Sequence, residues 1–162
     1  MLHKKILYIT PVLVPGSSAA SKRIVANSKL LQLLNYEVSI YSGLNRADEK
    51  ILDGIAIIPS GIGIEKNQGL KKLLAYRKSI LHTIEKISKQ DISNIKAIIV
   101  YSGYSFYIAP LIRWSKKNRI PLVFDAVEWY TPAKKTHWFL KPYFWNTEFA
   151  MQYFIPKTKN VI

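Results

Sequence analysis

The sequence contains no cysteine, so it can form neither a disulfide nor a thiolate metal site, and it has no cysteine nucleophile. It also lacks a long apolar run. A membrane span needs about 20 apolar residues, and the most apolar window, residues 54–64, is interrupted by Pro59, Gly61 and Gly63. No secretory signal pattern follows the first residues. These absences predict a soluble, cytoplasmic protein.

Histidine and the common nucleotide-binding patterns are also missing or sparse. His3, His82 and His137 are too far apart in the sequence to indicate a metal site. Neither GxGxxG nor GxxxxGK[ST] occurs, so neither a dinucleotide fingerprint nor a P-loop is indicated. We therefore predict no metal and no cofactor.

Acidic residues are few: 10 Asp and Glu stand against 24 Lys and Arg, which gives a net charge of +14. The basic residues concentrate in residues 69–90, 113–119 and 130–162. A positive field of this size favours nucleic acid, anionic lipid or a phosphorylated ligand, but it can also serve solubility alone. The bases are spread over several elements and no nucleic-acid reader motif is present, so we predict no nucleic-acid partner.

The residues that are present alternate between strand-like and helix-like patterns. The predicted strands are residues 6–10, 37–42, 55–59, 95–101 and 122–125, and the predicted helices are residues 18–35, 70–90 and 106–118. Continuously apolar strands indicate a parallel sheet that is covered on both faces. The predicted fold class is therefore α/β: one three-layer, Rossmann-like parallel sheet with helices on both faces.

Three further structural expectations follow from local pattern. The helix at residues 70–90 carries an apolar stripe that we assign to the core, formed by Leu70, Leu73, Leu74, Ile80, Leu81, Ile84 and Ile87. Residues 129–156 are expected to be irregular. Residues 156–162 are expected to enter one more strand.

Ligands of open parallel sheets bind beyond the carboxyl ends of the strands, so the loops that follow the strands are the candidate sites. In the first loop, Gly16 allows close backbone approach and the helix that starts near Ser18 favours an anion; Lys22 and Arg23 add charge if they face inward. The alternative is a plain strand–helix connection in which Ser17 or Ser18 caps the helix. Both interpretations stay open on the residues alone.

The stretch PLVFDAVEWY places two carboxylates, Asp125 and Glu128, directly after an apolar strand. Either carboxylate could accept a proton from a substrate hydroxyl or hydrogen-bond to it. Alternatively, each caps a helix or pairs with a lysine. The two residues need not share one role.

Three segments together resemble a known family: ILYI...P...GSSAASKRI....LL...YEVSIYS, then IIVYSGYSFYIAPLIRWSKKNRIPLVFDAVEWY, then FIPKTKNVI. Their order and spacing are similar to the N-terminal domain of a family 4 glycosyltransferase of the GT-B fold. In that family two Rossmann-like domains face each other, one mainly binding the acceptor and the other a nucleotide-sugar. The resemblance implies that residues 1–162 form the N-terminal, acceptor-side domain and that the C-terminal, donor-binding domain, required in cis, is absent from this chain.

The same resemblance implies residue roles. Asp125 and Glu128 match the acids of the family motif D-x-H-E and would be catalytic. Asp125, nearest the strand end, is favoured as the group that accepts the proton, and Glu128 as a supporting or helix-capping group. The donor diphosphate would be bound by Gly16, Ser17, Ser18 and Arg23, and the acceptor by Ser102, Gly103, Tyr104, Trp129 and Tyr130. The implied reaction moves a sugar, with retention of configuration, from a nucleotide-sugar to a glycan or lipid-linked acceptor in cell-envelope polysaccharide synthesis.

Two departures from the family pattern limit this transfer. Gly16-Ser17 stands where the family often has paired glycines, and Val127 stands where the motif has histidine. Without the second domain, we expect the chain alone to be close to inactive, because one wall of the substrate site is missing.

The aromatic and basic segment at residues 136–154 has three interpretations. It forms part of the acceptor site, it rests on the anionic inner face of the cell membrane, or its rings simply pack under a loop or against the absent domain. Two rival functions from other classes are a non-catalytic flavodoxin-like binding module, which would share the fold, and a basic nucleic-acid-binding domain.

Overall fold

The computed structural model describes residues 4–44, 48–64, 69–126, 142–158 and 160–162. The strands are β1 (Lys5–Ile9), β2 (Glu37–Ser42), β3 (Lys50–Leu52), β4 (Ile55–Pro59), β5 (Ile95–Val100) and β6 (Leu122–Phe124). The helices are α1 (Ala19–Leu33), α2 (Gly69–Ser88), α3 (Ser105–Lys117) and α4 (Pro142–Phe149). A π-helical turn, Ala150–Phe154, and a 3₁₀ turn, Ile155–Thr158, continue from α4.

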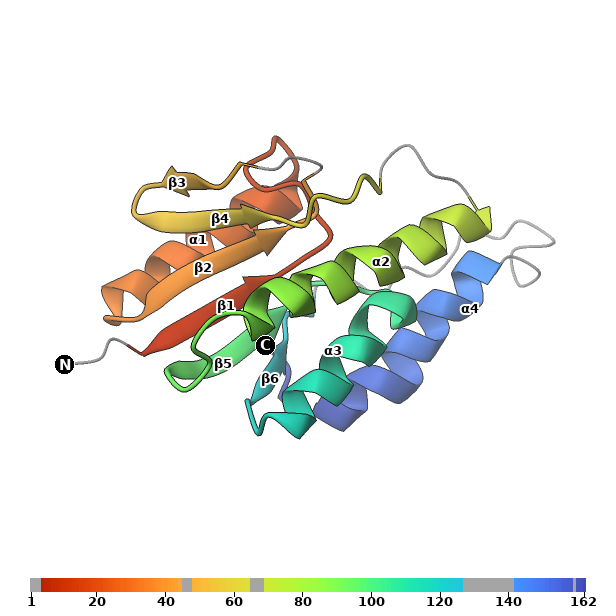
Figure 1. The fold of residues 1–162 in the computed structure, drawn as a ribbon. Coiled ribbons are helices and arrows are strands. Elements are labelled where there is room, and N and C mark those ends of the chain that lie inside the picture. Colours follow the sequence, from red (N-terminus) through yellow and green to blue (C-terminus); the bar gives the residue numbers. More distant parts are fainter. Residues whose placement is uncertain (1–3, 45–47, 65–68, 127–141, 159) are drawn as a thin grey trace.

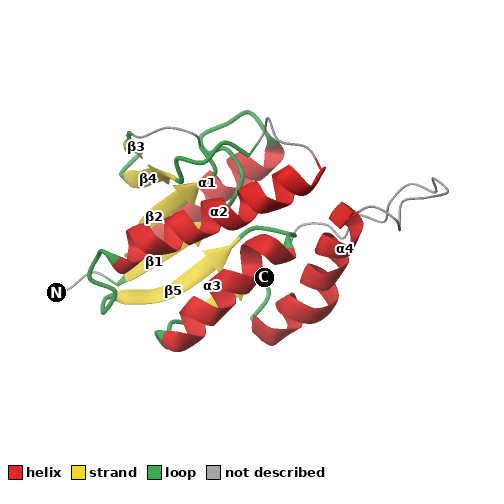
Figure 2. Ribbon diagram, turned by 45° about the vertical axis from the view of Figure 1, so that its right-hand side comes forward, coloured by secondary structure: helices red, strands yellow, loops and turns green. Residues whose placement is uncertain are grey.

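The six strands form one sheet in the order β3-β4-β2-β1-β5-β6. All neighbouring strands are parallel except β3 and β4, which are antiparallel. Figure 1 shows α1 on one face of this sheet and α2, α3 and α4 on the other, and Figure 2 shows the same three layers. The predicted fold class is confirmed.

The strands are parallel and buried because their apolar runs have no polar face. In β1, the residues from Ile6 to Ile9 are all buried, and so are the last three residues of β5, residues 98–100. A sheet with one wet face would instead alternate between apolar and polar residues. The expectation that the strands at residues 6–10, 38–41, 95–101 and 122–124 share one parallel sheet is confirmed.

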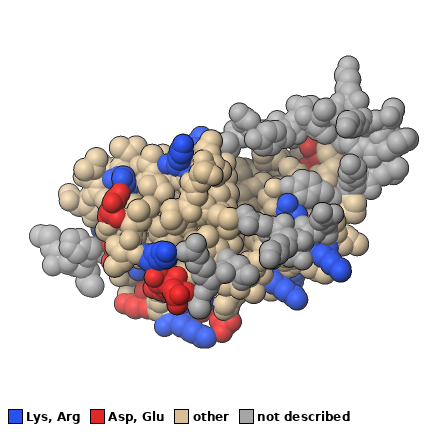
Figure 3. Space-filling model, turned by 90° about the horizontal axis from the view of Figure 1, so that it is seen from above, with Lys and Arg blue, Asp and Glu red and all other residues tan. Residues whose placement is uncertain are grey.

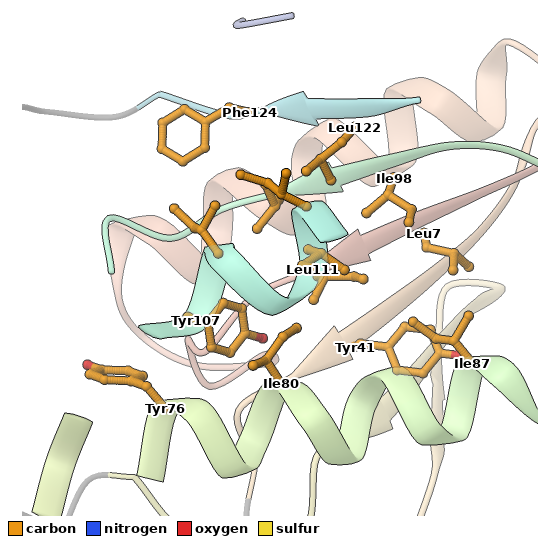
Figure 4. Close-up of a cluster of buried hydrophobic side chains, with 14 of the residues drawn as sticks. Leu7, Tyr41, Tyr76, Ile80, Ile87, Ile98, Tyr107, Leu111, Leu122 and Phe124 are labelled. Atoms are coloured by element: carbon orange, nitrogen blue, oxygen red, sulfur yellow. The ribbon is translucent and has the colours of Figure 1, made fainter. Parts of the chain in front are cut away.

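The larger part of the core lies between the sheet and the face covered by α2 and α3. Leu7 and Ile98 from the sheet meet Ile80 from α2 and Leu111 from α3, and all four side chains are completely buried (Figure 4). The opposite core, under α1, contains Tyr8, Ile24 and Ile40. Burial on both faces fixes the register of the central strands, because a slip by one residue would exchange the two sets of side chains.

Replacing Ile80 by alanine is expected to lower the free energy of unfolding by about 2–5 kcal/mol, because the removed atoms leave a cavity in this core. Its neighbour on α2, Leu81, is 46% exposed and provides a matched control, whose replacement by alanine should change stability by less than about 0.5 kcal/mol. Urea unfolding of both variants measures the difference. Equal losses would contradict the observed orientation of α2.

The structure corrects the predicted core face of α2. Leu73, Ile80 and Ile87 are buried, whereas Leu70, Leu74 and Leu81 are 65%, 53% and 46% exposed. The residues that share the buried face are instead Ala75, Tyr76, Ser79 and Thr83. The sequence prediction was wrong here because it assigned leucines to the core by type, while small and hydroxyl side chains allow α2 to approach the sheet and α3.

The short hairpin of β3 and β4 was not predicted. Asp53 and Gly54 form its two-residue turn, with φ values of 50° and 79°, and Leu52 pairs with Ile55 across it. Two consecutive positive φ angles are those of a type I′ turn, for which Asp-Gly is a preferred sequence. The signal was therefore present in the sequence as LDGI.

The expectation of irregular structure at residues 129–156 is wrong from Pro142 onward, where the chain is helical through Thr158. Buried Asn146 ties this segment to α3: its Oδ1 accepts from Ser105 Oγ at 2.5 Å and from the Phe106 amide at 3.0 Å. The contact supplies hydrogen-bond partners at the N-terminus of α3, where helical amides have none of their own.

Residues 160–162 lie against β6. The Phe124 amide donates to Asn160 O at 2.8 Å, and the Ile162 amide donates to Phe124 O at 3.0 Å. Val161 pairs with Phe124 in a parallel bridge. The expectation of a strand entry at residues 156–162 holds only for this bridge, because residues up to Thr158 belong to the 3₁₀ turn.

Candidate functional site

The strand order identifies the edge of the sheet where a ligand is expected. The chain leaves β1 toward β2 on one side, and β5 lies on the other side of β1, so the order reverses between β1 and β5. Open parallel sheets bind ligands outside the carboxyl ends of the strands at such a switch point. The segments that follow β1, β5 and β6 meet at this edge.

The loop after β1 is held by the loop after β2. Val12 O accepts from the Gly43 amide at 3.0 Å and from Ser42 Oγ at 3.0 Å, and the Val14 amide donates to Ser42 Oγ at 2.8 Å. A Cβ atom at Gly43 would lie 1.9 Å from Pro11 O. The absence of a side chain at Gly43 therefore allows the two loops to meet.

The predicted donor loop also has an internal structural role. The Gly16 amide donates to Ser21 Oγ at 2.8 Å, and a Cβ at Gly16 would lie 2.6 Å from Leu13 O. Ser18 is the N-cap of α1, because its Oγ accepts from the Ser21 amide at 3.1 Å. Ser17 and Ser18 are exposed. A larger residue at Gly16 would therefore deform the loop itself, so the loop's ligand-binding role is better probed at other positions.

Arg23 and Asp125, 102 residues apart in sequence, form an ion pair at the switch point. Arg23 Nη2 donates to Asp125 Oδ1 at 2.6 Å. The Asp125 side chain is completely buried, whereas the Arg23 side chain is 43% exposed. The structure thus brings together one residue predicted to bind the donor and one predicted to be catalytic.

The second oxygen of Asp125 is also engaged. Oδ2 accepts from the hydroxyl of Tyr8, a buried residue of β1, and Asn27 Nδ2 lies 3.5 Å from the same hydroxyl. The Asp125 amide donates to Val100 O at 2.9 Å, which fixes the backbone after β6. Both carboxylate oxygens of Asp125 accept a hydrogen bond, and its side chain has no exposed surface. A general base, in contrast, must be accessible to the substrate hydroxyl.

Sequence reasoning did not identify Tyr8 and Asn27 as parts of this cluster. Tyr8 lies within an apolar strand, where an aromatic ring is expected in the core. Asn27 follows Arg23 by four residues on α1, so both side chains share a helix face. In the sequence, this four-residue spacing was the only indication that Asn27 and Arg23 lie on the same side of the helix.

The buried tyrosines are expected to make the free energy of unfolding depend on pH. Burial raises the pKa of Tyr8, Tyr41 and Tyr107, that of Tyr41 to about 12, and the hydrogen bond to Asp125 raises the pKa of Tyr8 further. In the unfolded chain these groups have a pKa of about 10. Above that pH the unfolded chain releases protons that the folded protein keeps.

The free energy of unfolding is therefore expected to fall as pH rises from about 10 toward the folded-state values, and these three tyrosines add no pH dependence below about 9. Urea unfolding across this range measures the slope, and tyrosinate absorbance shows whether some tyrosines ionise only on unfolding. Normal titration of all ten tyrosines in the folded protein would contradict the prediction.

The acceptor candidates are only partly described. Ser102 is buried, and its Oγ accepts from the Tyr104 amide at 3.3 Å. Tyr104 stacks on Tyr76, with ring centroids 4.2 Å apart. A Cβ at Gly103 would meet no heavy atom within 4 Å. Glu128, Trp129 and Tyr130 lie outside the described residues.

The described part of the chain contains no cluster of three His, Cys, Asp or Glu residues that could hold a metal ion. None of the helices in the described ranges is long and apolar enough to cross a membrane. In Figure 3 most of the visible acidic surface lies toward the left of the view, whereas Lys and Arg side chains occur toward both ends. Positive charge on this face is therefore not gathered in one patch.

The fold and its switch point define a Rossmann-like α/β domain. Among solved structures it is similar to sucrose-phosphate synthase from Thermosynechococcus elongatus, a glycosyltransferase of the GT-B fold, with a TM-score of 0.54 and 11% sequence identity. The match covers 78% of this chain and 33% of that protein, so the chain spans about a third of that protein's length. No protein-family model and no curated protein sequence matches the chain. At this identity the similarity establishes the fold.

Proposed function

We propose that this chain is the acceptor-side domain of a retaining, family 4 glycosyltransferase that moves a sugar from a nucleotide-sugar to a glycan or lipid-linked acceptor. The observation that carries the proposal is Arg23, whose side chain is 43% exposed and whose guanidinium is bonded to Asp125 at the switch point of a glycosyltransferase-like fold. An arginine guanidinium is positively charged and can bind phosphate oxygens bidentately. The proposal includes no metal and no cofactor, and it requires a second α/β domain to complete the donor site.

The proposed residue roles are those that the family resemblance implies. Gly16, Ser17, Ser18 and Arg23 would lie beside the donor diphosphate, near the N-terminus of α1, which favours an anion. Residues 102–104 would border the acceptor together with Trp129 and Tyr130. The sequence favours Asp125 as the group that accepts the proton of the acceptor hydroxyl and gives Glu128 a supporting or helix-capping role. Because Asp125 is buried and bonded to Arg23 and Tyr8, we instead propose Glu128 as the proton acceptor.

The test uses the protein at its full natural length with a panel of nucleotide-sugars and a cell-envelope lipid extract as acceptor. Release of nucleoside diphosphate, and a glycosylated product with retained anomeric configuration by NMR, are the expected results. A protein that turns over no nucleotide-sugar, or that forms an inverted product, would contradict the proposal. Binding to nucleic acid without turnover would favour the rival class.

Arg23 gives a sharper measurement of the same site. Arg23→Ala removes a charged hydrogen-bond donor, which contributes about 1.5–3 kcal/mol, so donor affinity should fall about 10- to 100-fold. Lys29 is the matched control, because it has the same charge on the same helix but pairs with Asp53, 2.6 Å away. Lys29→Ala should leave donor affinity within about twofold, and thermal unfolding checks that both variants fold.

A peripheral contact with anionic membrane is proposed for the exposed face of α2. Leu70, Leu74 and Leu81 lie on one stripe of this helix, and exposed Lys71, Arg77 and Lys78 lie on the same helix. Exposed leucines among cations suit the boundary between headgroups and acyl chains. On α4 and the π-helical turn, Trp145, Phe149 and Tyr153 are also more than half exposed.

Sedimentation with phosphatidylglycerol vesicles tests this contact. Replacing Leu70 and Leu74 together by serine should lower vesicle binding about tenfold or more, since each leucine removed from the lipid loses more than 1 kcal/mol. Leu33, the last residue of α1, and Leu34, its C-cap, are 79% and 66% exposed and are the matched control pair. Equal losses for both pairs would indicate non-specific adsorption and overturn the assignment to α2.

A further inference from the structure

We propose that Asp125 and Tyr8 are positioning residues: a buried pair that holds the Arg23 guanidinium at the switch point, in the orientation that binds a diphosphate. This inference rests on the proposed function and changes the role of Asp125 from that of a proton acceptor. It adds Tyr8, which touches no substrate, to the residues on which donor affinity depends.

The first step of the argument is the state of the Asp125 carboxylate. Its side chain has no exposed surface, and its two oxygens have different donors, Arg23 Nη2 for Oδ1 and the Tyr8 hydroxyl for Oδ2. A buried carboxylate is stable when charge and hydrogen bonds compensate it, as these two donors do. To accept a substrate proton, the carboxylate would have to become accessible to the substrate, whereas its side chain is completely buried.

The second step is the rigidity of the support. Tyr8 belongs to β1, at the centre of the sheet, where it pairs with Ile40 on one side and Ile99 on the other. The Asp125 amide is bound to Val100 O of β5. The carboxylate is therefore fixed from two strands, and a group fixed in this way can hold the rotamer of a long side chain that contacts it.

The third step concerns the N–H donors of Arg23 that remain available for a ligand. Arg23 is the fifth residue of α1, one turn from the N-cap at Ser18, and 43% of its side chain is exposed. A guanidinium has five N–H donors, and the contact with Asp125 uses Nη2. Other N–H donors of the same planar group remain for an anion on the exposed side. Because the rotamer is already fixed, less conformational entropy is lost when the anion binds.

The positioning role is tested first without any ligand. In the full natural protein labelled with ¹⁵N-arginine, the Nε–Hε relaxation of Arg23 reports the order of its side chain. We expect an ordered side chain in the wild type and a mobile one in Asp125→Asn, with a smaller effect in Tyr8→Phe. Lys29→Ala should change nothing. An Arg23 side chain that is equally ordered in all four proteins would overturn the inference whatever the protein binds.

The second measurement is affinity for the probes ADP, GDP and UDP. Asp125→Asn should weaken binding of whichever probe the wild type binds about tenfold, and Tyr8→Phe about threefold. In an Arg23→Ala background, Asp125→Asn should have no further effect, because residues that act through one another are not additive. An equal loss in both backgrounds would overturn the inference, as would a fall of 100-fold or more in kcat with unchanged KM, which is the signature of a proton acceptor.

The two measurements separate this inference from the proposed function. Suppose that none of the three diphosphates binds the wild type, but that the Arg23 side chain becomes mobile in Asp125→Asn. The donor-site function and the diphosphate-binding role of Arg23 are then wrong, whereas the positioning of Arg23 by Asp125 is correct. If diphosphate binds and Arg23 keeps its order, the function stands and the positioning fails. Circular dichroism and thermal unfolding identify any variant that does not fold.

Discussion

Gly43→Ala should lower the free energy of unfolding by about 3–5 kcal/mol, the largest loss we expect from a single added methyl group in this protein. The new Cβ would lie 1.9 Å from Pro11 O and 2.5 Å from the Pro11 carbonyl carbon. Both atoms belong to the backbone, so no side chain can move aside to relieve the clash. The loops after β1 and β2 must separate.

That separation breaks the bonds between the loops. Val12 O loses the Gly43 amide and Ser42 Oγ as donors, and the Val14 amide loses Ser42 Oγ. Because the loop after β1 carries Gly16 and leads into α1, its displacement should also weaken the donor site. A drop of about 10 °C in the melting temperature is expected from the loss in free energy.

Gly103→Ala is the matched control for stability. Gly103 follows the neighbouring strand β5 at the same edge of the sheet, and a Cβ there would meet no heavy atom within 4 Å. Its melting temperature should stay within about 2 °C of the wild type, since a surface substitution usually changes stability by less than about 0.5 kcal/mol. If Gly43→Ala unfolds at the same temperature as Gly103→Ala, the close approach of the two loops is not a feature of the protein in solution.

The strands were predictable because one physical signal determines them. A strand buried on both faces needs an apolar run without interruption, and the predicted ranges 37–42 and 55–59 match β2 and β4 residue for residue. Both ends of each predicted helix lie within about two residues of the observed ends. Ser18 is the N-cap of α1, as expected if the first loop is a plain strand–helix connection. Each of these features depends on residues close together in the sequence.

Features that depend on distant residues were not predictable in the same way. The helical segment after Pro142 is attached to α3 through Asn146, whose partners lie 40 and 41 residues away. No local sequence pattern predicts that an asparagine in an aromatic segment will form a hydrogen bond to another helix. The exposed leucines of α2 show the same limit, because which face of a helix is buried depends on what the neighbouring elements present.

In the candidate site, too, the features set by nearby residues were predictable and those set by distant residues were not. That polar residues after β1 and β6 meet at one edge follows from the topology, and the sequence identifies Arg23 and Asp125 separately as candidates. Their pairing does not follow, because it depends on the strand order, in which only β5 separates β1 from β6. Tyr8 lies in a strand predicted from its apolar run, and nothing in that run indicates that the tyrosine hydroxyl provides the second bond to Asp125.

Arg23→Met should lower the free energy of unfolding by about 3 kcal/mol at neutral pH. The substitution keeps much of the apolar stem but leaves a completely buried carboxylate without its counter-charge, which typically costs about 3–5 kcal/mol. We expect the lower end of this range because the Arg23 side chain is 43% exposed and water partly screens the pair. Urea unfolding of the full natural protein measures the loss.

The double variant Arg23→Met with Asp125→Asn distinguishes a stranded charge from a simple loss of packing. Asparagine is neutral and its oxygen can still accept from the Tyr8 hydroxyl, so the double variant should recover about 2 kcal/mol relative to Arg23→Met. Such recovery would show that the cost of the single variant comes from the buried carboxylate. If the double variant is as unstable as Arg23→Met, or if Arg23→Met is as stable as the wild type, then the ion pair does not stabilise this edge of the sheet, and the charge on Asp125 is tolerated without Arg23.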